Sequence, residues 1–407
     1  MLEFNPAFSY KEISSMKKLL LALFAMAGIT VAQAQSSVTI YGILDVGYVG
    51  SNQQLTSTAG AAKTKTQTSQ FGQSAESTSR LGFKGNADLG GGTSAFFTAE
   101  FQLYPEDQNL SGSSNSGLLN RQTFVGIKQT GYGSTAIGRQ YTPIYNAAAK
   151  TSPTGFNNVV GDVIYLGSTS GGAGTSTSTT ITGQENGIGF TNRASNSLTL
   201  QTDRYYGLSA NGMYQLNNKN TTQTAASTGG ETNTNGYGLS VDYVWDKLLV
   251  NAATQSFTQY TTGTATAFSD INLGTLVSAK DVQNFAGATY DFGILKAYAQ
   301  YVQRTITSTI NSSQFAKRSA QQVGVRAFIT PRVESWASVG NGTFDQYGST
   351  NGSVPFTAYQ IGSNYYLSKR TNLYGIFGST QSSGNQQTTA GAASSKNMYA
   401  LGVRHTF

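Results

Sequence analysis

Apolar and polar residues alternate with a period of two along most of this chain. In the closing stretch, Tyr399, Leu401 and Val403 alternate with small or polar residues, and the last residue is Phe407. Successive side chains of a β-strand point to opposite faces, so this period predicts a strand and excludes a helix there. The apolar face can meet a soluble core, or it can meet lipid while the polar face lines a lumen.

Four further segments show the same alternation. Their apolar positions are Val38, Ile40, Leu44, Val46 and Tyr48; Leu81, Phe83, Ala87 and Leu89; Tyr237, Leu239, Val241, Tyr243 and Trp245; and Tyr359, Ile361, Tyr365 and Leu367. Seven short connections alternate with eight long ones, of which the first spans residues 50–78 and the longest residues 142–192. Fifteen connections join sixteen strands. We therefore predict an all-β fold, a sixteen-stranded antiparallel transmembrane β-barrel wide enough for an aqueous channel.

The composition favours the membrane interpretation over a soluble enzyme. Charged residues make up 11% of the chain, far below the usual share for a soluble domain, and hydrophobic residues make up 38%. Disorder is excluded because the chain holds 23 Tyr and 21 Phe, whereas disordered segments are poor in aromatic residues. Cysteine is absent, so disulfides, thiolate metal sites and cysteine nucleophiles are excluded. Closure of a hydrogen-bonded barrel would supply stability instead.

The N-terminus is typical of a secreted protein. Lys17 and Lys18 precede an apolar run over residues 19–31, and Ala32-Gln33-Ala34 forms a cleavage site. The run is shorter than the roughly 20 residues that span a bilayer as a helix. We expect cleavage after Ala34, translation from Met16, an upstream extension and signal peptide over residues 1–34, and a barrel over residues 35–407.

The mature chain is mildly basic. Of 26 basic and 19 acidic residues, three basic and two acidic ones precede residue 35, which leaves 23 against 17, a net charge of +6. These charges are spread along the strands without a basic run, so no nucleic-acid partner is expected.

Several short motifs occur in an order that is typical of one family. They are "SSVTIYG" at residues 36–42, "STSRLGFKGNADLGGG" at 77–92, "RQTFVGIK" at 121–128 and the closing "VRHTF". With these motifs the chain resembles the Gram-negative porins, trimeric sixteen-stranded barrels of proteobacterial outer membranes. The resemblance implies a homotrimer in outer-membrane lipid that passes ions and small hydrophilic solutes passively and needs no cofactor or metal. It also implies that Phe407 belongs to the signal that the barrel assembly machinery recognises.

The resemblance also implies a site in the pore. In the family, the third loop, here residues 142–192, folds inward and narrows the channel opposite an arginine cluster. Arg80, Arg121 and Arg193 occupy the matching positions. The alternation places Arg80 and Arg193 on the lumen face, but Arg121 has the parity of the outward residues Val125 and Ile127.

The charge around this site is expected to be positive. Asp162 and Glu185 are the acidic residues between positions 142 and 202, and Asp162 is the acidic residue we expect at the constriction. Residues 167–180 form a neutral Gly/Ser/Thr run where related porins are often acidic. Three arginines then predict a modest anion preference that salt screening weakens. Each arginine could instead be a solvated rim charge or the partner of a nearby acid.

Two other classes of function compete with a channel. A barrel hydrolase needs a histidine base, and the single histidine, His405, has the parity of Leu401 and Val403, which faces lipid. Enzymatic activity is therefore not expected. A surface-display barrel, such as an adhesin or phage receptor, stays open as the alternative because long Ser/Thr/Asn-rich loops are compatible with it, and conductance would distinguish the two.

Overall fold

The computed structural model describes residues 37–56, 63–112, 117–165, 184–186, 189–224, 229–261, 278–347, 352–383 and 393–407. The expected signal peptide and the neutral run at 167–180 lie outside the described residues and stay predictions. Among the described residues, no helix is long and apolar enough to cross a membrane.

Almost every described element is a strand. The elements are β1 (Ser37–Thr56), β2 (Lys63–Gln73), β3 (Arg80–Gly90), β4 (Thr93–Gln102), β5 (Leu119–Gln129), β6 (Gly133–Tyr141), α2 (Pro143–Lys150), β7 (Gln184–Asn186), β8 (Thr191–Thr202), β9 (Leu208–Thr221), β10 (Gly230–Trp245), β11 (Leu248–Thr261), β12 (Ala279–Asp291), β13 (Lys296–Ser308), β14 (Phe315–Thr330), β15 (Val333–Tyr347), β16 (Gly352–Tyr366), β17 (Thr371–Ser382) and β18 (Ser394–Thr406).

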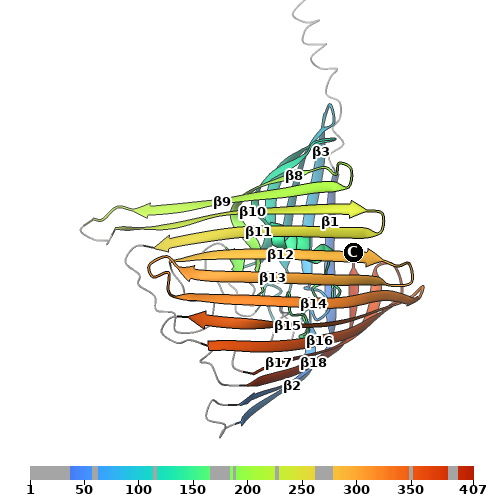
Figure 1. The fold of residues 1–407 in the computed structure, drawn as a ribbon. Coiled ribbons are helices and arrows are strands. Elements are labelled where there is room, and N and C mark those ends of the chain that lie inside the picture. Colours follow the sequence, from blue (N-terminus) through green and yellow to red (C-terminus); the bar gives the residue numbers. More distant parts are fainter. Residues whose placement is uncertain are drawn as a thin grey trace, which may run out of the picture.

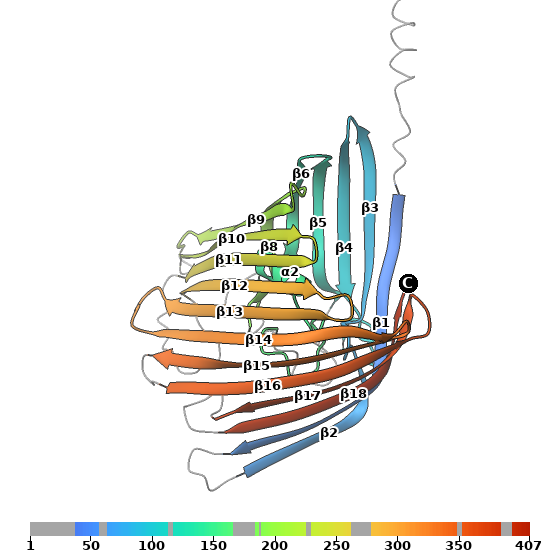
Figure 2. The ribbon, with the colours of Figure 1, turned by 45° about the vertical axis from the view of Figure 1, so that its right-hand side comes forward.

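These strands form one closed antiparallel ring (Figures 1 and 2). Pairing runs from β3 to β6, from β6 to β8, and onward to β18. The ring closes because β1 pairs with β18 on one side and with β3 on the other. β2 and β3 pair with successive parts of β1 and therefore count as one strand of the ring. Among the described strands, the three-residue β7 pairs only with the start of β8 and is not counted as a strand of the ring. The described ring therefore has sixteen places, which confirms the predicted strand number.

One predicted connection is wrong. Residues 50–78 were expected to form a loop, but β1 continues to Thr56 and pairs with β2 over eleven residue pairs. The reason is chemical, because the β2 sequence KTKTQTSQFGQ is polar on both faces and carries no apolar alternation to detect. Strands β9 and β10 likewise extend further into their predicted loop than the alternation indicated.

The two faces of the ring differ as the alternation predicted. On β16, Tyr359 and Ile361 are 48% and 57% exposed, whereas Gln360 between them is 1% exposed. Large apolar side chains thus point out of the ring and amides point into it, the arrangement of a barrel in lipid. His405 lies on the outer face, and its Nδ1 is 2.9 Å from the Thr371 hydroxyl.

The C-terminal residue completes the closure. The backbone N–H groups of Phe407 and Gly42 each donate to the carbonyl of the other at 3.1 Å. The Phe407 ring covers Gly42 so closely that a Cβ at residue 42 would overlap the ring. A glycine at position 42 is therefore needed for the terminal ring to lie against β1.

Candidate functional site: an arginine cluster on the inner wall

Three predicted arginines lie together on the inner wall. Arg121 Nε donates to Glu100 Oε1 at 2.7 Å, and Arg80 Nη1 lies 4.0 Å from the same oxygen. Arg121 Nη2 and Arg193 Nη2 donate to the Tyr141 hydroxyl at 3.0 and 3.1 Å. Strands β3, β5 and β8 thus bring Arg80, Arg121 and Arg193 around Glu100 of β4 and Tyr141 of β6.

A β-bulge explains why Arg121 points inward against its parity. Glu100 pairs with Gln122 and Phe101 pairs with Asn120, so Arg121 has no partner on β4. An extra residue of this kind re-aims the side chains beside it. The Arg121 side chain consequently reaches Glu100 and is only 5% exposed.

A fourth arginine, Arg139 of β6, belongs to the same cluster and was not predicted from the sequence. Its Nη2 donates to Glu185 Oε2 at 3.1 Å, its Nη1 donates to Ser195 Oγ at 2.9 Å, and Glu185 also forms an ion pair with Arg193. The parity of Arg139 matches that of Ile137, which faces outward. A register shift between β6 and β8 at Gly138/Gln140 breaks the alternation there.

The cluster carries an excess of positive charge. Four arginines face two carboxylates, Glu100 and Glu185, which leaves two positive charges uncompensated within these ion pairs. Burial alone would raise the pKa of Glu185, which lies in the third loop, but Arg193 and Arg121 outweigh burial and lower that pKa. The carboxylate therefore stays charged near neutral pH, and the excess is not changed by its protonation.

The four arginines differ in exposure. The side chains of Arg80 and Arg139 are each 18% exposed, whereas those of Arg121 and Arg193 are each 5% exposed. Arg80 and Arg139 are therefore more accessible to a solute, while the buried Arg121 and Arg193 act mainly through their field.

Aromatic rings connect the cluster to the third loop. Tyr141 stacks on Tyr145 of α2, with ring centroids 3.9 Å apart and planes 2° apart. The Arg193 guanidinium carbon lies 4.7 Å from the Tyr141 ring centroid. The first turn of α2 is fixed by Thr142, whose hydroxyl caps the N–H of Tyr145, and by Pro143 at its start. The helix start is thus held beside the arginines.

The described part of the third loop lies against a row of inward amides (Figure 2 shows α2 behind β11 and β12). Amide side chains from β11 to β16 bond to its backbone. The bonds are Asn251 to the carbonyl of Ala147 (2.7 Å), Gln300 to that of Ala148 (3.0 Å), Gln360 to those of Val159 (3.0 Å) and Val160 (3.1 Å), and the N–H groups of Val163 to Gln322 (2.9 Å) and of Thr191 to Gln283 (2.8 Å). Buried loop carbonyls and N–H groups are thereby satisfied by the wall.

The hydrogen bonds of Asp162 lie within the third loop and do not reach the arginine cluster. Its Oδ1 accepts from the N–H groups of Ile164 and Tyr165 at 2.8 and 2.9 Å, and the Thr154 hydroxyl donates to its Oδ2. Its side chain therefore shapes the turn of the loop over residues 154–165. A direct role at the constriction stays a prediction.

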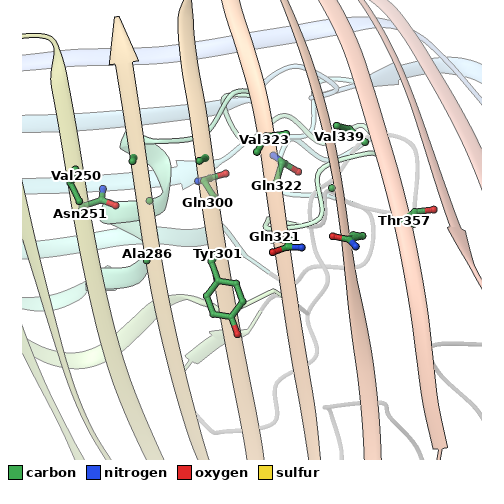
Figure 3. A pocket seen from close by; sticks show the side chains of 15 residues that line it. Val250, Asn251, Ala286, Gln300, Tyr301, Gln321, Gln322, Val323, Val339 and Thr357 are labelled. Atoms are coloured by element: carbon green, nitrogen blue, oxygen red, sulfur yellow. The ribbon is translucent and has the colours of Figure 1, made fainter.

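A groove of about 850 Å³ lies elsewhere, on the wall formed by β11 to β16 (Figure 3). Small side chains, including Ala286 and Ala288 of β12 and Ala299 of β13, leave a depression between Val250 and Val323. No residue of the arginine cluster lines it. The groove is a feature of the wall and lies apart from the cluster.

Comparisons with known proteins agree with this architecture. The family model described as Gram-negative porin matches residues 20–385. The outer membrane porin protein 32 of Delftia acidovorans is 27% identical over 393 residues, which cover 96% of this chain and 95% of that protein. The structure of an anion-selective porin from Comamonas acidovorans has a TM-score of 0.66 and 22% identity, over 92% of this chain and 100% of that one.

A trimer form of OmpT, an outer membrane protein of Vibrio cholerae, has a TM-score of 0.56 and 14% identity, over 91% of this chain and 99% of that one. These structural likenesses show the fold, and the family model covers far more than half of the sequence. The chain belongs to the Gram-negative porin family.

Proposed function

We propose that this protein is a general diffusion porin of the outer membrane. It forms a water-filled channel through which ions and small hydrophilic solutes pass passively, with a modest preference for anions. The observation that carries the proposal is the arginine cluster on the inner wall, where four arginines meet two carboxylates. A sixteen-stranded ring has an interior too wide for side chains alone to fill.

The third loop is the element that we propose narrows this channel. Its described residues hydrogen-bond to inner-wall amides of β11 to β16, while Tyr141 and Tyr145 connect its beginning to the arginines. Arg80 and Arg139 then line the narrowed passage, and Asp162 holds the shape of the loop. A passing anion meets these arginines at short range, where attraction is strongest.

Planar-bilayer recording under a salt gradient tests the proposal. The purified mature protein is expected to give ohmic conductance steps and a reversal potential displaced toward that of the anion. Raising the salt should reduce the displacement, because the Debye length falls from about 10 Å at 0.1 M to about 3 Å at 1 M. An electrically silent but folded barrel would favour the surface-display alternative.

Replacing Gln360 by alanine is expected to loosen the loop and increase current fluctuations. The Gln360 amide bonds to Asn157, to the carbonyls of Val159 and Val160, and to the Trp336 indole. Its loss leaves buried polar groups without partners, at about 1–3 kcal/mol each. Single-channel noise measures the effect, and Ile361→Ala, on the outward neighbour, is the control. Equal noise in both variants would show that Gln360 does not hold the loop.

We infer a non-enzymatic role from the place of the single histidine. His405 contacts Thr371 on the outer face, away from the inner wall where a hydrolytic site would need its base. We also propose that the protein is a homotrimer in outer-membrane lipid. Support comes from the short strands β3 to β6, of 9–11 residues, whose outward side chains Val125, Ile127 and Ile137 are more than half exposed.

A further inference from the structure

The wall has a second inward segment, residues 74–79, between β2 and β3. β2 pairs with residues 46–56 of β1, and β3 pairs with residues 37–43. Between these two ladders the chain leaves the sheet. Its residues are nevertheless buried, with Ser74, Ala75 and Ser79 at most 1% exposed. We call residues 74–79 the inward segment.

Asp45 of β1 anchors the backbone of the inward segment. Its Oδ2 accepts from the N–H groups of Glu76 and Ser77 at 2.9 and 2.6 Å, and its Oδ1 accepts from the Tyr374 hydroxyl at 2.7 Å. The N–H of Asp45 donates to Ser79 Oγ at 3.0 Å, and so replaces the strand partner that is lacking there. Both carboxylate oxygens therefore have partners, although the residue is fully buried.

The Glu76 side chain ties the segment to three further strands. Its Oε1 accepts from Asn364 Nδ2 at 2.8 Å and its Oε2 accepts from Asn372 Nδ2 at 2.9 Å. Arg404 Nη1 lies 3.4 Å from Oε1, and Arg404 Nε donates to Asn372 Oδ1 at 3.1 Å. Through Glu76 the segment is bound to β16, β17 and β18. Bonds to a charged acceptor are stronger than neutral ones, so this anchor is stiff.

The inward segment also receives the third loop. The Asn158 side chain donates to the Ser74 carbonyl at 2.6 Å, and the Asn158 N–H donates to the Ala75 carbonyl at 2.9 Å. Ala75 packs with Val159 and Val160 of the loop in one buried apolar cluster. The loop is thus held by this segment as well as by the inward amides of β11 to β16.

The end of the segment holds Arg80. The Arg80 Nε donates to the Thr78 carbonyl at 2.8 Å and its Nη2 donates to Ser77 Oγ at 3.2 Å. Ser77 is the partly exposed member of the segment, and it lies beside the guanidinium that is itself partly exposed. The position of Arg80 therefore depends on the segment that precedes it.

We propose that the inward segment is a second constriction element, which lines the pore at Ser77 and fixes both Arg80 and the third loop. Glu76 is the residue that positions the inward segment, through its contacts with β16, β17 and β18. The inference rests on the proposed channel function. It assigns part of the pore's selectivity to an interrupted strand of the wall in addition to the third loop.

Cysteine modification tests whether Ser77 lines the pore, because the chain has no native cysteine. In Ser77→Cys, the negatively charged reagent sulfonatoethyl methanethiosulfonate is expected to lower single-channel conductance and to move the reversal potential toward cations. The control is Leu81→Cys on the outward face of β3, where the same reagent should leave both unchanged. An unreactive Ser77→Cys thiol, or an unchanged current after modification, would overturn the proposal. Loss of conductance in the unmodified parent protein would instead count against the channel function.

A second variant tests Glu76. In the Ser77→Cys background, Glu76→Gln is expected to make modification about tenfold faster, because a charge-assisted anchor is lost and the segment opens more often. Asp88→Asn, which removes one negative charge from the inner face of β3 outside this network, should leave the rate unchanged. Equal rates in the Glu76→Gln, Asp88→Asn and parent channels would show that Glu76 does not position the segment.

Discussion

Replacing Arg80, Arg121, Arg139 and Arg193 together by glutamine is expected to abolish the anion preference of the channel. The cluster then loses its two excess positive charges and carries at most two negative ones, because Glu100 and Glu185 remain but burial raises the pKa of Glu185 once Arg193 and Arg121 are gone. One unit charge about 5 Å from an ion in water contributes about 0.8 kcal/mol. Screening at physiological salt roughly halves this. The loss of at least two net charges then changes the free energy of each ion by at least about 0.8 kcal/mol. Because the anion loses attraction while the cation loses repulsion, the permeability ratio changes at least about tenfold.

The reversal potential in a salt gradient measures the change. A triple variant, in which glutamine replaces only Arg80, Arg121 and Arg193, should shift the potential in the same direction by a smaller amount. The matched control removes four exposed charges away from the cluster, through Lys63→Gln, Lys65→Gln, Arg332→Gln and Arg370→Gln. This control should keep the anion preference. If the two four-residue variants behave alike, selectivity comes from overall charge and the cluster has no special part in it.

Deleting Phe407 is expected to lower the amount of folded barrel in the outer membrane at least about tenfold. The deletion removes two backbone hydrogen bonds to Gly42, each contributing about 1 kcal/mol, and the ring that covers this glycine. We also propose that the terminal aromatic residue is read by the barrel assembly machinery, so delivery would fail together with closure.

The folded fraction can be followed by heat-modifiable electrophoretic mobility of membrane fractions. Thr406→Ala is the control, since it keeps the terminal ring and removes a hydroxyl bond to the Arg370 carbonyl. Refolding of the deletion variant in detergent separates the two causes. Normal refolding with poor insertion would indicate a lost signal, and poor refolding would indicate a weakened closure. Normal amounts in the membrane would contradict both.

The strand number could be predicted because the outward face of each spanning segment must be apolar. Tyr359 and Ile361 on β16 display this requirement directly in the sequence. β2 could not be predicted, because it is polar on both faces and has the composition of a loop. β2 is held by backbone hydrogen bonds to β1, and these bonds do not depend on a pattern of apolar side chains in the sequence.

The arginine site could be predicted only in part. Arg80 and Arg193 were placed by alternation and resemblance together. Arg121 and Arg139 both lie at register shifts, where one extra residue reverses the face to which parity assigns a side chain. The ion pair between Glu100 and Arg121 joins neighbouring strands at such a shift. Regular alternation of the two faces along the sequence could therefore not predict it.

The amides that hold the third loop separate two properties of the channel. Asparagine and glutamine side chains carry no net charge, so salt screens their short-range hydrogen bonds to the loop very little. The size limit of the passage should therefore persist when the surroundings become saline. Its discrimination between anions and cations, which depends on long-range attraction, should fade in brine.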